Sequence, residues 1–175
     1  MAGQPKMDPK YFEYKGKIYP DYIRRGNHAQ YILPVAGKMC VGKGIDIGAG
    51  NEKWAFPGAD TCDLNSDPPW NDATKIPVNS DHYDFVFSSH CLEHIPDYYA
   101  ALQEWIRIIK PGGVLFLYLP SIECEYWRPS NDRKHLHILY PDDVKYDFIS
   151  LGITNIVVSG IDAAYSYCIY GILDG

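Results

Sequence analysis

Apolar and polar residues along this chain follow two periods, one typical of strands and one typical of helices. Four short apolar runs predict strands, the last of which is apolar throughout, as expected for a strand buried on both faces of a parallel sheet. These runs are GIDIG (44–48), ADTCDL (59–64), YDFVFSS (83–89) and VLFLYLP (114–120). Two further runs, ITNIVVS (153–159) and YSYCIYGIL (165–173), are separated by about five residues, which predicts an antiparallel hairpin.

Two helices are predicted between these strands. The apolar stripe of the first consists of Leu102, Trp105, Ile106 and Ile109. Lys110-Pro111-Gly112-Gly113 is expected to end this helix and to turn the chain. Pro141 opens the second helix, and Gly152 is placed to cap it. The stripe of the second consists of Val144, Phe148 and Leu151.

Strands that alternate with helices predict an α/β fold with a mostly parallel sheet and right-handed crossovers, closed by a C-terminal antiparallel strand pair. Between Gly50 and Tyr83 there is little room for two crossover helices, so the early crossover helices are expected to be shortened or missing. Residues 1–40 are rich in Tyr and Pro, and we interpret them as an irregular N-terminal extension with one or two short helices. Residues 41–175 are then the domain.

Composition restricts the location and the partners. The 175 residues suffice for one domain with a core. No apolar run is long enough to span a membrane, and the polar N-terminus lacks the apolar core of a signal peptide, so no membrane partner and a cytoplasmic location are expected. The net charge of −6 argues against binding to duplex nucleic acid. Five cysteines without a C-x-x-C pair predict reduced, packed thiols.

The most informative motif is the glycine turn that follows the first strand. Gly48 and Gly50 let the backbone approach a ligand at the carboxyl end of that strand, where open α/β sheets bind ligands. A third glycine, which pyrophosphate binding uses, is absent, and this disfavours a nicotinamide dinucleotide. Asp63 ends the second strand and suits two ribose hydroxyls. The Asp72 carboxylate can accept a hydrogen bond from an adenine amine, while Ala73 supplies a backbone N–H. A turn or cap role is the alternative for both acids.

Taken together, these segments resemble the class I (Rossmann-like) S-adenosylmethionine-dependent methyltransferases of the "methyltransferase type 11" kind. The matching segments are DIGAGN (46–51), DLN (63–65), DATKIP (72–77), YDFVFSSHCLEHI (83–95), IIKPGGVLFLYLP (108–120) and the closing strand pair. The resemblance implies S-adenosylmethionine as the cofactor and methyl transfer to the O or N of a small-molecule acceptor, such as a sugar or biosynthetic intermediate. A monomer or homodimer is expected, without nucleic acid as a partner. The alternative is a non-catalytic S-adenosylmethionine-binding module, or pseudo-enzyme, that acts through a partner, which the trimmed early helices favour.

The resemblance also implies which residues bind the cofactor. Residues at the glycine turn would frame the methionine half of the cofactor. Residues after the second predicted strand would contact the ribose and the adenine. Residues at the end of the third predicted strand would line the sulfonium. They are Asp46, Gly48, Gly50, Asp63, Leu64, Asp72, Ala73, Ser88, Ser89 and His90. Arg24 or Arg25 would reach the cofactor carboxylate, with a solvated surface pair as the alternative.

Methyl transfer from a sulfonium is an in-line displacement, so much of the catalysis comes from positioning the acceptor, and a base is needed only for a protonated one. His90, Glu93 and His94 share a helical face by their spacing and are the candidate catalytic residues. The candidate substrate wall consists of Tyr126, Trp127, Arg128, His135 and His137.

A divalent metal is a second possibility at the same residues. The small-RNA 2′-O-methyltransferases and the ubiquinone-pathway O-methyltransferases carry E-x-x-E-H here and bind a divalent metal, whereas this chain has His90 in place of the first Glu. A metal at Glu93, His94 and His137 is therefore considered, and a His/carboxylate set suits Zn²⁺, Mn²⁺ or Fe²⁺ better than Mg²⁺. Hydrogen bonds that tie helix to sheet explain the same residues, so the preferred interpretation contains no metal.

Asp67-Pro68-Pro69-Trp70 is spelled like the catalytic tetrapeptide of adenine-N6 methyltransferases. In those enzymes the tetrapeptide follows the strand beside the glycine-turn strand, where this chain has Ser88-Ser89-His90. Here it follows the ribose acid instead, outside its structural context. We therefore interpret it as a rigid loop whose Trp covers hydrophobic surface.

Overall fold

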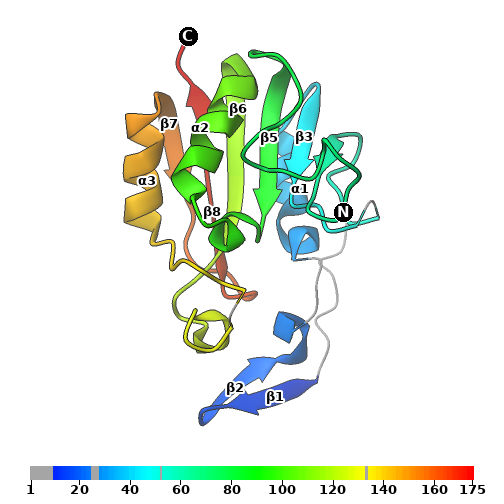
Figure 1. Ribbon diagram of the computed structural model, residues 1–175. Coiled ribbons are helices and arrows are strands. Elements are labelled where there is room, and N and C mark those ends of the chain that lie inside the picture. Colours follow the sequence, from blue (N-terminus) through cyan, green and yellow to red (C-terminus); the bar gives the residue numbers. More distant parts are fainter. Residues whose placement is uncertain (1–9, 25–27, 52, 133) are drawn as a thin grey trace.

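A computed structural model describes residues 10–24, 28–51, 53–132 and 134–175, and its centre is one six-stranded sheet in the order β4-β3-β5-β6-β8-β7 (Figure 1). Its strands are β3 (Gly44–Ile47), β4 (Asp60–Cys62), β5 (Tyr83–Ser89), β6 (Ile109–Pro120), β7 (Ile153–Val158) and β8 (Ser166–Leu173). The pairs β4–β3, β3–β5 and β5–β6 are parallel, and β6–β8 and β8–β7 are antiparallel. The predicted α/β fold, mostly parallel with a C-terminal antiparallel strand pair, is confirmed.

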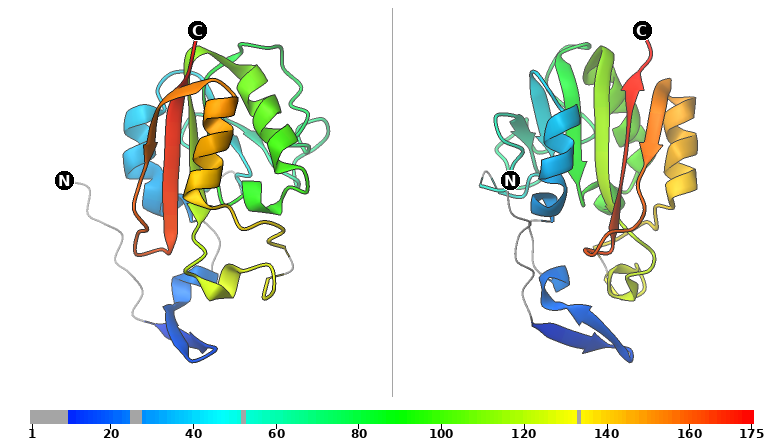
Figure 2. Two further views of the ribbon diagram at one scale, coloured as in Figure 1. Left: turned by 90° about the vertical axis from the view of Figure 1, so that its left-hand side faces the viewer. Right: turned by 180° about the vertical axis from the view of Figure 1, so that it is seen from behind.

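Helices cover both faces of this sheet. The helix α1 (Ala29–Met39) lies on one face, and α2 (Tyr98–Ile108) and α3 (Pro141–Ser150) lie on the other (Figure 2). Three short 3₁₀ turns, η1 (Asp21–Arg24), η2 (Leu92–His94) and η3 (Glu125–Trp127), lie in the connections. No helix occurs between β3 and β5 among the described residues, as the short spacing predicted.

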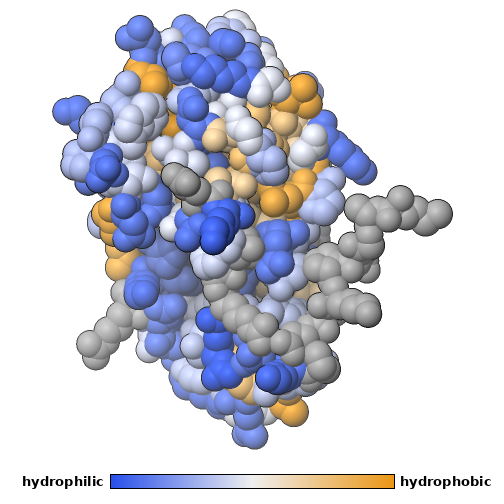
Figure 3. All heavy atoms as spheres, turned by 90° about the vertical axis from the view of Figure 1, so that its right-hand side faces the viewer, coloured by the Kyte–Doolittle hydropathy of each residue, from blue (hydrophilic) through white to orange (hydrophobic). Residues whose placement is uncertain are grey.

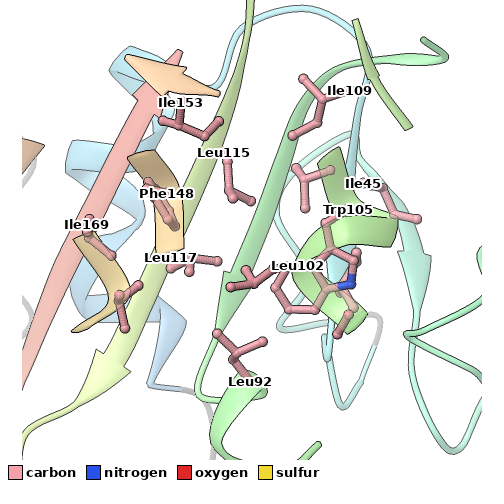
Figure 4. Packing of buried hydrophobic residues seen from close by; sticks show 14 of the residues in the cluster. Ile45, Leu92, Leu102, Trp105, Ile109, Leu115, Leu117, Phe148, Ile153 and Ile169 are labelled. Carbon is pink, nitrogen blue, oxygen red and sulfur yellow. The ribbon is translucent and has the colours of Figure 1, made fainter. Parts of the chain in front are cut away.

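The side chains of β6 show why both faces are covered. Leu115 and Leu117 belong to the cluster that α2 and α3 complete, whereas Phe116 and Tyr118 belong to the cluster that α1 completes. Successive side chains of a strand point to opposite faces, so a strand that is apolar at every position needs a layer on each side. Figure 4 shows the α2 and α3 side, where Trp105 and Leu102 pack between the strands and the helices.

The end of the first predicted helix differs from the expectation. Ile109 was expected in the helical stripe and Lys110 to Gly113 in a turn, but all of them belong to β6, in which Ile109 pairs with Tyr83. Pro111 explains the early end, because a proline disfavours helical backbone at the residue before it. In place of the predicted turn, β6 is irregular at this point. Gly112 has a φ of 80°, and the pairing of β5 with β6 shifts in register between Tyr83 and Phe85.

Residues 10–24 are also more regular than expected. They form a hairpin of β1 (Tyr11–Tyr14) and β2 (Lys17–Pro20), followed by η1. Lys15 and Gly16 have φ of 50° and 74°, as in the type I′ turns that join such strands. The hairpin packs against η3 beyond the carboxyl ends of β3 and β5, at the bottom of Figure 1. Residues 1–9 lie outside the described part, and the division at residue 40 stays a prediction.

The remaining expectations concern the cysteines and the membrane. All five cysteines are free thiols, four of them buried and Cys91 half-buried, which confirms the prediction of reduced, packed side chains. Within the described residues, no helix has both the length and the apolar character that crossing a membrane requires.

Candidate functional site

The glycine turn after β3 is shaped by a close approach of two chain segments. Gly48 has a φ of 86°, and a Cβ there would lie 2.3 Å from the Cβ of Cys91 in the turn after β5. Gly50 has a φ of 67°, but its side-chain position is open, with Trp54 the nearest neighbour at 3.8 Å. Gly48 therefore allows the two strand ends to meet, and Gly50 leaves open space where the turn faces solvent.

Asp63, directly after β4, joins the neighbouring strand end to this turn. Its Oδ2 accepts a hydrogen bond from the Gly50 backbone N–H at 2.9 Å, and its Oδ1 accepts one from the Asn65 N–H at 2.9 Å. The side chain of the next residue, Leu64, is 84% exposed. An exposed apolar side chain beside a fixed carboxylate suits a ligand that combines an apolar ring with hydroxyl groups.

A cavity of about 460 Å³ opens at this place. It is lined by Ala49, Gly50, Asn51, Lys53, Thr61, Asp63, Asn65, Ser66 and Asp67. A second cavity of about 580 Å³ shares Thr61, Ser66 and Asp67 with the first and is also lined by Phe56, Pro57 and Trp70. Of these two cavities, the first alone contains the glycine turn and Asp63. Figure 3 shows this side of the molecule, where polar and apolar residues are interspersed over the surface.

Asp46 is not among the residues that line that cavity. It is buried within β3, where its Oδ2 accepts a hydrogen bond from the Phe56 N–H at 2.8 Å. Burial raises the pKa of Asp46 to about 7, and the nearby Asp63 adds to the rise. The structure thus gives Asp46 a fold-supporting contact, and its predicted role in framing the methionine half stays untested.

The raised pKa of Asp46 makes stability depend on pH. An unfolded aspartate has a pKa near 3.9, so between about pH 4 and 7 the folded state holds a proton that the unfolded state has released. Stability is therefore highest below the unfolded pKa, falls as pH rises, and becomes constant above the folded pKa of about 7. We expect Asp46→Asn to gain about 2 kcal/mol relative to the wild type between pH 5 and 7 in urea denaturation. Parallel pH curves for the two proteins would refute this.

Asp72 and Ala73 are engaged in local structure. The Asp72 Oδ1 accepts hydrogen bonds from the Thr74 N–H at 2.9 Å and from the Thr74 hydroxyl at 2.7 Å, and these bonds lower the pKa of Asp72. The Ala73 carbonyl accepts a hydrogen bond from the Trp105 Nε1–H at 2.8 Å. This is the turn role that the sequence left open for Asp72, and contact with adenine stays a prediction.

The end of β5 is more enclosed than the sequence suggested. The Ser88 hydroxyl donates to the Ile47 carbonyl at 2.8 Å, and Ser89 lies beside it at the end of the strand. His90 has a φ of 50°, stacks on His28 with ring centroids 4.4 Å apart, and meets the Trp127 ring edge-on at 5.0 Å. Burial holds the pKa of His90 well below its usual value, so this imidazole is neutral.

A cluster of imidazoles surrounds Glu93, the middle residue of η2. Its Oε1 lies 3.7 Å from His90 Nδ1, 3.7 Å from His94 Nε2 and 3.9 Å from His135 Nε2. Burial raises the pKa of Glu93 and lowers that of His135. His137, which the sequence analysis grouped with Glu93 and His94, instead places its Nε2 2.9 Å from the Ile95 carbonyl. His135 takes its place because the loop docks with that residue facing Glu93.

The predicted substrate wall after β6 lies mostly against the N-terminal hairpin. Trp127 is buried in the cluster of Tyr19, Tyr22 and Cys124, and Tyr126 meets the ring of Phe12 edge-on at 5.1 Å. Here Arg128 donates to the Ile122 carbonyl at 3.1 Å. The hairpin was not foreseen as part of this region, although the Lys15-Gly16 pair between two apolar stretches is a turn signal that indicates it.

Two other predictions from the sequence concern the arginines of the N-terminal segment and the Asp67–Trp70 tetrapeptide. Arg24 pairs with Asp21 and lies over the Phe12 ring at 4.3 Å, which matches the surface-pair alternative, while Arg25 lies outside the described residues. The segment Asp67–Trp70 forms part of the loop after β4, and Trp70 packs against the main core cluster. This placement agrees with the interpretation of the tetrapeptide as a loop.

Comparisons with known proteins bear on the same segments. Residues 44–117 match the family model described as a methyltransferase domain. Methyltransferase TpcH of Aspergillus fumigatus is 43% identical over 53 residues, which cover 26% of this chain and 19% of that protein. A demethylmenaquinone methyltransferase of Mycolicibacterium paratuberculosis is 40% identical over 60 residues, which cover 34% of this chain and 24% of that protein. The chain thus spans about a fifth to a quarter of these curated relatives.

Similarity to a solved structure extends over the whole fold. A SAM-dependent methyltransferase of Thermotoga maritima, titled a possible histamine N-methyltransferase, superposes with a TM-score of 0.69. The superposition covers 87% of this chain and 98% of that one, at 16% sequence identity. An identity this low supports a shared fold alone.

Proposed function

We propose that this protein transfers a methyl group from S-adenosylmethionine to the O or N of a small molecule. The match of residues 44–117 to the methyltransferase domain model and the class I, Rossmann-like fold support this proposal. The observation that carries the proposal is the cavity of about 460 Å³ between the glycine turn and Asp63. It lies at the carboxyl ends of β3 and β4, where open α/β sheets bind ligands.

The residues of this cavity fit the cofactor by their chemistry. The Asp63 carboxylate has fixed geometry, because it accepts hydrogen bonds from Gly50 and Asn65, and its remaining lone pairs suit ribose hydroxyls. Leu64 does not line the cavity, but its exposed side chain follows Asp63 directly in the chain and suits one face of the adenine ring. The open side of Gly50 leaves room for the methionine part. S-adenosylmethionine supplies an activated methyl group, and these residues hold and orient it.

The first test is a calorimetric titration with S-adenosylhomocysteine. We expect micromolar binding to the wild type and at least about tenfold weaker binding to Asp63→Ala, because a charge-assisted hydrogen bond contributes roughly 1.5–3 kcal/mol. The matched control is Asp174→Ala, which removes the same charge from an exposed position far along the chain and is expected to bind like the wild type. Folded wild type that fails to bind would overturn the proposal.

A non-catalytic module that binds the same cofactor is the second candidate. The observation in its favour is the enclosure of His90 and Ser88 by neighbouring side chains at the point where an acceptor would approach. The two candidates differ in turnover. Production of S-adenosylhomocysteine with mixtures of small hydroxyl and amine compounds supports the enzyme, whereas binding without turnover in any mixture supports the module.

A further inference from the structure

Glu93 is a buried carboxylate whose surroundings do not satisfy it. Its side chain has no exposed surface, and neither oxygen has a hydrogen-bond partner among the residues that the structure describes. A buried carboxylate without a partner is costly, and such groups are normally paired or bound to a metal. Its Oε1 instead faces three imidazole nitrogens at 3.7–3.9 Å, too far for hydrogen bonds.

In two of the imidazoles, the ring nitrogen that faces away from Glu93 makes a hydrogen bond. This bond determines whether the nitrogen that faces Glu93 carries a proton. The Nδ1 of His94 lies 2.7 Å from the Lys134 carbonyl, which can only accept, so Nδ1 carries the proton. The Ser166 hydroxyl donates to the Ala164 carbonyl at 3.1 Å, so it accepts from His90 Nε2 at 2.9 Å. In their neutral forms both imidazoles therefore turn a lone pair toward the Glu93 carboxylate. Facing lone pairs repel unless a proton or a cation lies among them.

Three of these groups have the spacing of metal ligands. The ligand atoms of Glu93, His94 and His135 all lie within 4.8 Å of one another. With metal–ligand bonds of about 2.0–2.2 Å, ligands in tetrahedral geometry lie roughly 3.4 Å apart. The distances from Glu93 Oε1 to the His94 and His135 nitrogens, 3.7 and 3.9 Å, need to shorten by only a few tenths of an ångström.

The backbone already holds the two contributing segments together. The N–H groups of Leu136 and His137 donate to the Glu93 carbonyl at 2.8 and 3.3 Å. The hydrogen bond from His94 Nδ1 to the Lys134 carbonyl fixes the orientation of the His94 ring. Metal-binding histidines commonly use their second nitrogen in this way, which orients the ring and the tautomer.

We propose that Glu93, His94 and His135 bind one divalent first-row transition-metal ion, which ties the loop before α3 to the turn after β5. Two imidazoles and one carboxylate favour Zn²⁺, Co²⁺, Mn²⁺ or Fe²⁺ over Mg²⁺ and Ca²⁺, which prefer oxygen ligands. His94 is half-buried, whereas Glu93 and His135 are buried, so the ion enters from the His94 side. The competing occupant is a proton shared between Glu93 and an imidazole.

The test uses the full chain after removal of metals with a chelator. Zn²⁺ is titrated calorimetrically, and Co²⁺ is titrated with visible spectroscopy, which reports nitrogen and oxygen ligands directly. We expect one equivalent of each ion to bind with micromolar or tighter affinity and to raise the melting temperature. Slower hydrogen exchange at residues 134–137 is expected with the ion bound. Absence of stoichiometric binding by both ions would leave the shared proton as the occupant and would overturn the proposal.

Variants of the proposed ligands test where the ion binds. His94→Gln removes a half-buried ligand and is expected to fold, and His135→Gln removes a buried one. We expect each to weaken Zn²⁺ binding at least 100-fold. His137→Gln is the matched control, because it changes an imidazole of the same loop that faces Ile95 and Pro96, and its affinity is expected to stay within threefold of the wild type. Wild-type affinity in folded His94→Gln would place the ion elsewhere and would refute the assignment.

Discussion

Trp105→Ala is expected to lower the free energy of unfolding by about 3–5 kcal/mol, the largest effect of any single substitution considered for this protein. Trp105 has no exposed surface and lies where α2 packs on the sheet. Its Nε1–H also donates to the Ala73 carbonyl, so truncation leaves both a large cavity and an unpaired, partly buried carbonyl. The expected loss of stability is large because the Trp105 side chain both packs α2 on the sheet and holds the loop before β5 by a hydrogen bond.

Equilibrium urea denaturation, followed by far-UV circular dichroism, measures this effect. Trp54→Ala is the matched control, since it removes the same side chain from a position that is 41% exposed, and less than about 1 kcal/mol is expected there. Trp105→Phe keeps most of the packing and loses the hydrogen bond, so an intermediate loss is expected. Equal losses for Trp105→Ala and Trp54→Ala would contradict the assigned role of Trp105 in the core.

Gly48→Ala is expected to cost about 2–5 kcal/mol and to abolish binding of S-adenosylhomocysteine. Its left-handed φ of 86° disfavours any side chain, and the added Cβ would lie 2.3 Å from Cys91 Cβ and 2.5 Å from Cys91 Sγ. The strand end that carries the glycine turn would have to move away from the turn after β5. The same movement would displace Gly50 from Asp63.

Two further variants separate the steric cost from the backbone cost. Gly50→Ala meets only the left-handed φ of 67°, with its nearest neighbour at 3.8 Å, so about 1–2 kcal/mol is expected. Adding Cys91→Gly to Gly48→Ala removes the clashing atoms and should restore part of the lost stability. Denaturation curves of the wild type, Gly48→Ala, Cys91→Gly and the double variant measure the coupling, and additive effects in the double variant would show that Cys91 is not the obstacle.

The strands and the fold class were predictable because burial on both faces leaves a plain signal in the sequence. A run such as 114–120 has no polar position that a solvent-exposed face would need. The end of α2 was harder, because Ile109 continues the helical stripe while pairing as the first residue of β6. The apolar residue is buried either way, so only Pro111 marks where the backbone must change.

The candidate sites were predictable to a smaller extent. The glycine turn and Asp63 follow from where strands end, and the structure joins them through one hydrogen bond. The choice between His135 and His137 does not follow from spacing, because both lie in the same loop and alternate along it. It depends on the backbone bonds from Leu136 and His137 to Glu93, which connect residues more than forty positions apart. Such long-range docking leaves no local pattern in the sequence.

The position of β8 has a consequence for how the protein folds during synthesis. Ser166–Leu173 lies between β6 and β7, so β6, with strands on both sides in the finished sheet, remains an edge strand until these late residues emerge. Until then, the ribosome-bound chain presents an apolar strand with unpaired backbone groups, which is a template for pairing with other chains. The risk of aggregation is therefore concentrated in the interval between the emergence of β6 and that of β8, and β8 acts as the segment that covers the free edge of β6.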